Sequence, residues 1–294
     1  MNTWKTLRDL SFKFFKHSLD SSVNLFESIK PDLLKANIDL SLLEYVYVMF
    51  FSMLLFFIVE FPLVTIITSI VLKDILLAVL FSFTLNIVIV LIVFFIFYTY
   101  PSLIAGKRKK DIDSALPFAS TYMAAVANSG APPITMFGVI SQFKEYGEVS
   151  KEAEKIYRDV KVFGMDLTGA LRKTANRTPS EELKELLWGL DNVLTTGGNL
   201  SDFLHEKSRL FIADYGRKLQ EYSRTLSVLI EIYLTLVLVG SIFFIIITAL
   251  MSIIGGGGGM GGYLSFIQFL VIFIVLPFMS LGFIVLLKAV SPSA

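Results

Sequence analysis

The segment TTGGNLSDFLHEKS, residues 195–208, places two adjacent glycines, Gly197 and Gly198, between two stretches with helical periodicity. Glycine readily adopts the left-handed backbone conformation that ends a helix. Asn199 can cap the amino terminus of the helix that follows. The segment therefore predicts a tight turn between two helices that run in opposite directions.

The same pattern occurs twice upstream, at intervals of 34 and 33 residues. Gly130 opens GAPPITMF, Gly164 opens GMDLTGAL and Gly197 opens GGNLSDFL. Each copy has Pro, Asp or Asn two positions after the glycine and ends in a pair of apolar residues: Met136-Phe137, Ala170-Leu171 and Phe203-Leu204. Three hairpin tips predict a six-helix bundle. Tetratricopeptide repeats have a similar period but lack support from signature Trp and Tyr positions. Chance recurrence of glycine breaks in a helical domain is a further alternative.

A helix start is predicted at Thr178-Pro179-Ser180-Glu181, which fits a capping box with Pro179 at the first helical position. The helix that follows carries one apolar stripe, made of Leu183, Leu186, Leu187, Leu190, Val193 and Leu194. Further bundle helices are expected over residues 116–128, 148–162 and 201–219.

Long apolar runs identify an integral membrane protein, because 54% of the 294 residues are hydrophobic and the mean hydropathy is +0.69. Four spans are predicted: 45–72, 75–98, 228–254 and 264–287. The first would be about 42 Å long as a helix, against about 30 Å of hydrocarbon. We therefore expect it to tilt, to kink near Pro62, or to end there. Pro101 is expected to mark the exit of the second span.

The predicted fold is an all-α, polytopic membrane protein with five segments. An amphipathic amino-terminal region (1–44) lies on the membrane or packs on the protein, and spans 1–2 follow (45–100). The helical bundle (101–227), spans 3–4 (228–288) and a short tail (289–294) complete the chain. Basic residues before the first span and after the second place both termini and the bundle in the cytoplasm and the glycine loop 255–262 outside.

No residue pattern predicts catalysis, a cofactor or a metal. Cysteine is absent, and the two histidines, His17 and His205, lie far apart. The run GGGGGMGG joins two predicted spans rather than a strand and a helix, so we expect a flexible loop. Gly106-Lys107 is followed by arginine, which excludes a P-loop at this point. A net charge of +1 indicates no nucleic-acid partner.

Segment 100–240 resembles the type II secretion system F family. The stretches that carry the resemblance are YPSLIAGKRKKDIDSALPFASTYMAAVANSG, EYGEVSKEAEKIYRDVKVFGMDLTGAL, RTPSEELKELLWGL, TTGGNLSDFL and LIEIY. The archaeal branch, with archaellum subunit J and archaeal pilus platforms, is most similar, and Tad-type platform subunits are also similar. The resemblance implies a platform in the cytoplasmic membrane, with a hexameric assembly ATPase and pilin-like subunits as partners. Longer members carry two such bundles, so a homodimer or a pair with a second platform subunit is expected.

Candidate sites are all charged. The run Lys107, Arg108, Lys109 and Lys110 is expected to fix topology and contact anionic lipid, with the ATPase as alternative partner. Arg172, Lys173 and Arg177 are expected on a solvated face or at a docking surface. Glu60 and Glu231 are intramembrane charges, expected at the membrane boundaries or in a contact inside the platform or with a pilin-like subunit. The alternative function is a transporter or channel with a regulatory helical domain.

Overall fold

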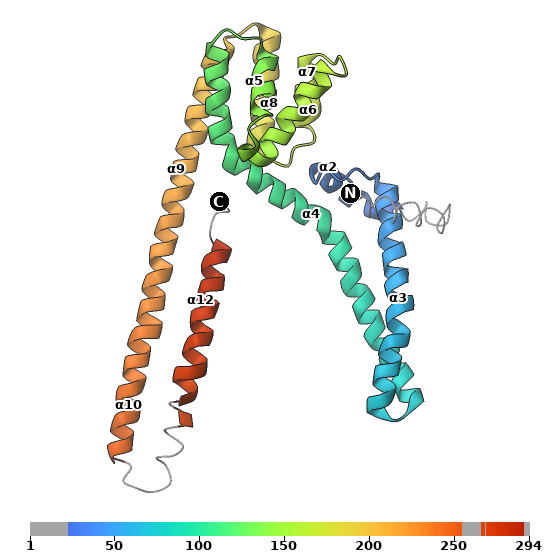
Figure 1. The fold of residues 1–294 in the computed structure, drawn as a ribbon, viewed down its shortest axis with the longest axis vertical. Helices are drawn as coiled ribbons and strands as arrows, with labels where there is room; N and C mark the ends of the chain where they lie inside the picture. Colours follow the sequence, from blue (N-terminus) through green and yellow to red (C-terminus); the bar gives the residue numbers. More distant parts are fainter. Residues whose placement is uncertain (1–22, 255–265, 268, 291–294) are drawn as a thin grey trace. The chain divides into compact units, whose positions relative to one another are not determined.

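The computed structural model describes residues 23–254, 266–267 and 269–290, and every regular element in these ranges is helical (Figure 1). The chain divides into two units, Met1–Lys207 and Ser208–Ala294. Four helices are long and apolar enough to cross a membrane: Leu42–Leu72, Ile75–Asn128, Leu200–Met251 and Val271–Lys288. The predictions of an all-α protein and of four helices able to span a membrane are confirmed for this part of the chain.

The first span, α3 (Leu42–Leu72), is one continuous helix through Pro62. It begins with a capping box, in which the Glu44 amide donates to Ser41 Oγ at 3.2 Å and the Ser41 amide donates to Glu44 Oε2 at 2.7 Å. It ends at Lys73, whose φ of 55° is left-handed. Of the sequence alternatives, a helix that ends at Pro62 is therefore wrong.

The second span belongs to α4 (Ile75–Asn128), a helix of 54 residues that continues through Pro101 and Pro117. The helix does not end at Pro101, so the boundary drawn at residue 100 falls inside a helix. That Pro101 marks the exit of the second span from the membrane stays a prediction. A proline removes the amide that would bond the carbonyl four residues earlier. For Pro101 that carbonyl belongs to Phe97, and the Tyr45 hydroxyl of α3 donates to it at 2.7 Å. A side chain from the neighbouring helix thus replaces the lost backbone bond.

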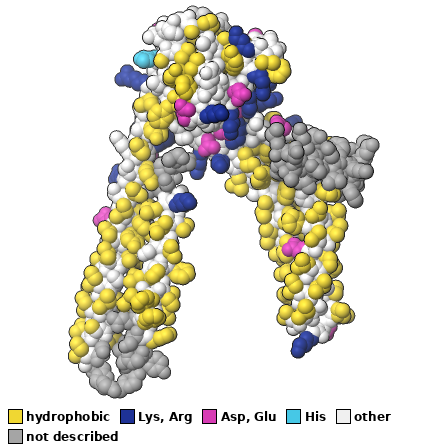
Figure 2. All heavy atoms as spheres, in the orientation of Figure 1, with side chains coloured by type: hydrophobic (Ala, Val, Ile, Leu, Met, Phe, Trp, Pro, Cys, Tyr) yellow, Lys and Arg dark blue, Asp and Glu magenta, His cyan; other side chains and the backbone are white. Residues whose placement is uncertain are grey.

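The helices α3 and α4 form an antiparallel hairpin. Asp74 caps α4 by accepting the Leu76 amide at 2.9 Å. Above the turn, Thr68 Oγ1 and Ser82 Oγ lie 2.7 Å apart, and the rings of Phe61 and Phe83 meet edge to face at 6.4 Å. Hydrophobic side chains cover the outside of this hairpin (Figure 2).

The amino-terminal segment packs on the rest of the unit. It forms the 3₁₀ helix η1 (Val23–Ile29) and α2 (Lys30–Lys35). Ile29 and Leu33 are buried with Tyr45 in one hydrophobic cluster, and Phe26 meets Phe50 and Phe94 edge to face. Packing on the protein, one of the two expected alternatives, is therefore what the described residues show; residues 1–22 lie outside them.

Four shorter helices follow α4: α5 (Pro133–Ile140), α6 (Gly147–Lys161), α7 (Leu167–Ala175) and α8 (Glu181–Thr196), with η2 (Lys144–Tyr146) before α6. Next comes α9 (Leu200–Tyr233). α5 packs against α4 and α6, α6 against α4 and α7, and α7 against α8, which also contacts α4. Phe203 of α9 packs on Gly189 of α8, where the missing side chain leaves room for its ring.

The three glycine turns are confirmed. Gly130, Gly164 and Gly197 have φ values of 72°, 69° and 75°, each in the left-handed region. Gly198, in contrast, is not among the residues with positive φ; its amide donates to Val193 O at 3.0 Å. Gly164 and Gly197 are followed by the expected helix caps. The Gly169 amide donates to Asp166 at 2.9 Å, and the Ser201 amide donates to Asn199 Oδ1 at 3.0 Å.

The predicted start of α8 is wrong by two residues. Ser180, not Thr178, is the cap, since the Leu183 amide donates to Ser180 Oγ at 3.1 Å. Pro179 therefore precedes the helix instead of occupying its first position. The Ser180 hydroxyl also donates to Asp113 Oδ1 of α4 at 2.5 Å, and this contact between helices was not visible in the sequence.

The second unit holds the rest of α9, the π-helical turn η3 (Leu234–Val239), α10 (Gly240–Ile254), η4 (Val271–Val275) and α12 (Leu276–Val290). The boundary drawn at residue 228 falls inside α9. Tyr233 stacks on Phe283 at 4.3 Å, and its hydroxyl lies 3.1 Å from Ser280 Oγ. The glycine loop 255–262 and residues 291–294 of the tail lie outside the described residues.

Candidate functional site

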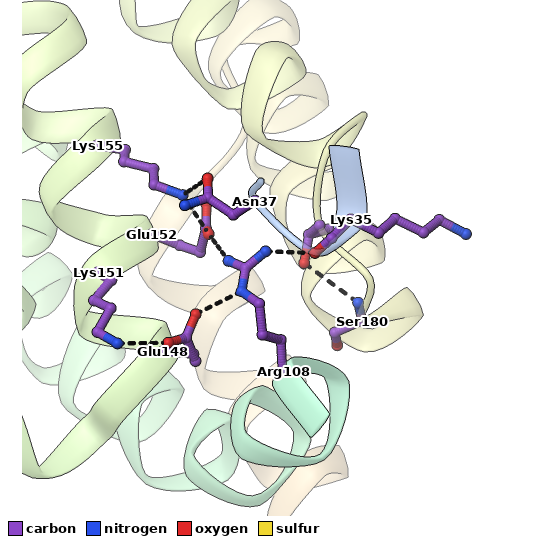
Figure 3. Close-up of polar contacts among 9 residues, drawn as sticks. Lys35, Asn37, Arg108, Glu148, Lys151, Glu152, Lys155 and Ser180 are labelled. Atoms are coloured by element: carbon purple, nitrogen blue, oxygen red, sulfur yellow. Dashed lines mark hydrogen bonds and ion pairs between the residues drawn. The ribbon is translucent and has the colours of Figure 1, made fainter. Parts of the chain in front are cut away.

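Arg108 is buried at the junction of three segments (Figure 3). Its Nε donates to Glu148 Oε2 at 2.7 Å, its Nη2 to Glu152 Oε1 at 2.5 Å, and its Nη1 to the carbonyl of Lys35 at 2.5 Å. The guanidinium thus joins α4 to α6 and to the end of α2. A planar group with several fixed donors suits such a three-way contact.

Two lysines of α6 complete this network. Lys151 Nζ bonds Glu148 Oε1 at 2.6 Å, and Lys155 Nζ bonds Glu152 Oε1 at 2.9 Å and Asn37 Oδ1 at 2.7 Å. Burial acts to raise the pKa of the Glu148 carboxyl. Hydrogen bonds from Lys151 and Arg108 outweigh burial, so the net pKa is lowered from its ordinary value of 4.5.

The expected role of the run 107–110 is therefore divided. Lys107, Lys109 and Lys110 are exposed on α4, whereas Arg108 has its side chain only 9% exposed and paired. Arg108 is therefore not available for contact with lipid or a partner, whereas the expected topology and lipid role of the three exposed lysines stays a prediction. The sequence context of Arg108 held a signal, because this residue lies on the helical stripe of Ala105 and Ile112, which are both buried. A charge on an apolar stripe indicates a buried partner, but its identity required the fold.

The second basic group is also largely paired. Arg172 Nε bonds the buried Asp191 at 2.8 Å, which raises the arginine pKa, although the side chain stays 52% exposed. Lys173 Nζ bonds the buried Asp159 at 2.6 Å. Arg177, just beyond α7, is exposed and lines a small polar cavity. The three residues thus do not form one freely solvated face, because two of them tie α7 to α8 and α6.

Glu60 is not at a helix end. It lies 12 residues before Leu72 inside α3, about 18 Å along the helix. Its Oε2 is buried without a hydrogen-bond partner, as are both polar atoms of Asn86, which is fully buried on α4. Asn86 is one turn from Phe83, which packs on Phe61, so this hairpin carries two unpaired polar groups at one level. Glu231, in contrast, is exposed on α9.

Among the residues that the structure describes, no group of three or more His, Asp or Glu side chains could hold a metal ion. The arrangement of charges around α6 and α7 is that of an ion-paired scaffold. Basic side chains gather at the junction of α4 with these helices (Figure 2).

The comparison with protein families agrees with the helical hairpins. Residues 119–248 match the model of the family described as type II secretion system (T2SS), protein F. This part of the chain is therefore similar to the type II secretion system protein F family. The matched range begins inside α4, covers all three glycine turns, and ends inside α10.

The chain is also similar to proteins from archaea. An uncharacterised protein of Methanocaldococcus jannaschii is 30% identical over 144 residues, 49% of this chain and 24% of its own length. A flagella accessory protein J of the same organism is 27% identical over 137 residues, 46% of this chain and 24% of its own. Another, of Methanococcus voltae, is 26% identical over 117 residues, 40% of this chain and 21% of its own. The chain thus matches about a quarter of each relative, and no solved structure matches it.

Proposed function

We propose that this protein is a platform subunit in the cytoplasmic membrane of a machine that builds a type IV pilus-like filament or a secretion pseudopilus. The observation that carries the proposal is the match of residues 119–248 to the secretion system F family, on a segment with three left-handed glycine turns. Similarity to flagella accessory proteins J supports the archaeal form of such a machine.

In this proposal, the second half of α4, α5 to α8 and the start of α9 form a cytoplasmic six-helix bundle, and both termini are cytoplasmic. The basic residues Lys107, Lys109 and Lys110 support this orientation. Because the chain lacks cysteine, single cysteines at Gly258 and Ser114 can be labelled in whole cells with an impermeant thiol reagent. We expect labelling at position 258 only; labelling at 114 and not at 258 would reverse the orientation.

The assembly ATPase is proposed to bind at the end of the bundle where the glycine turns lie. The turns after α4, α6 and α8 lie at one end of these helices (Figure 1). The turn after α6 exposes Val162 and Phe163, which are 71% and 68% accessible. At the same turn, hydrogen bonds from the Thr168 hydroxyl and the Gly169 amide lower the pKa of Asp166, and the nearby positive charge of Arg172 lowers it slightly further. An exposed aromatic residue in this turn and a half-exposed arginine near Asp166 have the composition of an interface anchor.

The test measures binding of the full-length protein in detergent to a hexameric assembly ATPase from the same organism. Phe163→Asp should abolish binding, and Arg172→Gln should weaken it most at low salt, since surface charges are screened over about 8 Å at physiological ionic strength. Trp188→Gln, at another exposed aromatic residue, is the matched control. If the wild-type protein does not bind the ATPase, the result contradicts the proposed coupling to the ATPase and favours the transporter alternative.

A platform with one bundle would act in pairs. Longer relatives of the family carry two bundles, and a second copy of this chain or a second platform subunit would supply the other. Pilin-like subunits are proposed to pass from the bilayer to the filament beside the spans. Crosslinking of the protein in intact membranes, followed by mass determination, tests the pairing.

A further inference from the structure

A small polar cavity lies between the loop that precedes α3 and the helices α6 and α7. Its volume is about 210 Å³. Arg158 of α6 and Arg177 beyond α7 both line it, with Asp39 of the loop. Within the described part of the chain, neither arginine side chain has a hydrogen bond or an ion pair.

The other charges of the cavity are already balanced by each other. Lys155 bonds Glu152, and Lys173 bonds Asp159. Two guanidinium groups and one carboxylate, that of Asp39, then remain for a ligand, so the cavity has an excess of positive charge. Two arginines that line one cavity suit the oxygens of a phosphate, because each guanidinium can donate two parallel hydrogen bonds.

The position of the cavity indicates where the phosphate would come from. Asp39 is three residues before Leu42, the first residue of the membrane-spanning helix α3. This helix has 31 residues and is about 46 Å long, against about 30 Å of hydrocarbon. Its ends therefore extend into the headgroup layers, and three residues of chain reach at most about 11 Å further. The cavity thus lies within reach of lipid headgroups.

We propose that Arg158 and Arg177 bind the phosphate of an anionic membrane lipid whose headgroup enters this cavity. The bound lipid would hold α6 and α7 close to the bilayer surface. Asp39 opposes the phosphate and keeps the affinity moderate, so that bilayer lipid fills the site while dilute soluble phosphate does not. The proposal requires only that the chain sits in the membrane and is independent of the platform function.

The test uses the full-length chain, purified in detergent and stripped of lipid. Binding of phosphatidylglycerol is measured by native mass spectrometry, and diacylglycerol with the same acyl chains is the probe without a phosphate. A basic residue at a membrane surface contributes about fivefold to binding of an anionic lipid. Arg158→Gln with Arg177→Gln should therefore weaken phosphatidylglycerol binding about 25-fold, and Asp39→Asn should strengthen it.

The control is Lys144→Gln with Lys161→Gln, which removes two exposed charges, of η2 and α6, that do not line the cavity. It should leave most of the affinity intact. Equal loss in this control and in the arginine variant would show diffuse attraction and overturn the site, as would unchanged binding in the arginine variant. Displacement of the lipid by millimolar inorganic phosphate would identify soluble phosphate as the ligand and overturn the lipid assignment. Thermal unfolding of all variants shows that each is folded.

Discussion

Replacing Arg108 by glutamine should release the amino-terminal segment from the helices beneath it. Arg108 contacts Glu148, Glu152 and the Lys35 carbonyl. The substitution removes the positive charge, and the shorter amide side chain can keep at most one of these three contacts. The carboxylates stay largely buried, with side chains 14% and 6% exposed. Breaking a buried ion pair costs about 3–5 kcal/mol when one partner is left alone. Here each carboxylate keeps a lysine, so we expect about 2–4 kcal/mol.

Hydrogen exchange of the amides of residues 32–38 measures this loss of stability locally. The experiment does not require the whole membrane protein to be unfolded. The amides of Ala36 and Ile38 donate to Asp32 O and Leu33 O, at 2.7 and 3.1 Å, and should be protected. A loss of 2–4 kcal/mol speeds exchange by about thirtyfold to several hundredfold, because each 1.4 kcal/mol is a factor of ten. The exchange rate in the variant cannot exceed the rate for the segment when it is fully detached.

Two further variants make this result specific. Arg108→Lys keeps the charge but cannot reach three acceptors from one flexible ammonium, so its effect should be intermediate. Lys109→Gln, at the exposed neighbour, should exchange like the wild type. If exchange in Arg108→Gln equals that of Lys109→Gln, the guanidinium does not hold the segment and the reasoning from burial fails.

Three other predictions follow from the contacts described above. The pKa of Glu148 is lowered in the folded protein, so the stabilisation from this carboxylate is complete above its ordinary pKa of about 4.5 and is lost as pH falls through the folded pKa. Protection of the amino-terminal segment against hydrogen exchange should therefore fall below about pH 4.5. The fall should be smaller in Glu148→Gln. Gly197→Val should cost about 1–3 kcal/mol in a left-handed turn with open space around the missing Cβ, and Gly197→Asn clearly less; equal protease resistance in both variants would contradict the backbone explanation. Tyr45→Phe should cost about 1–3 kcal/mol by leaving the Phe97 carbonyl unpaired; an unchanged melting temperature in detergent would show that the carbonyl has another partner.

Local chemistry explains what the sequence predicted well. A left-handed glycine, an Asp or Asn cap and an apolar stripe act over one or two helical turns, and each was found where expected. Gly130, Gly164 and Gly197 have positive φ, and Leu183 and Leu186 are buried on α8. The spans were predictable for the same reason, since a membrane helix is defined by its own composition.

Contacts between distant residues explain what the sequence did not predict. Arg108 and Glu148 are 40 positions apart, and Arg172 and Asp191 are 19 apart. No periodicity links such pairs, so the stripe of Ala105 and Ile112 could indicate that Arg108 is buried but not which carboxylates it meets. The three predicted docking residues were therefore grouped by sequence proximity, although the fold ties two of them to different helices.

The continuity of α4 shows how one non-local hydrogen bond changes the mechanical character of the molecule. Pro101 favours a break in the helix because it leaves the Phe97 carbonyl without its backbone donor, and an unpaired buried carbonyl costs about 1–3 kcal/mol. Tyr45 of α3 supplies the donor, so α4 continues without a break from the hairpin that it forms with α3 to the first glycine turn at Gly130. A continuous helix transmits displacement along its axis, whereas a loop at the same place would absorb it. If α4 carries motion between a cytoplasmic partner and the spans, as the proposed function requires, Tyr45 is the residue on which that rigid connection depends.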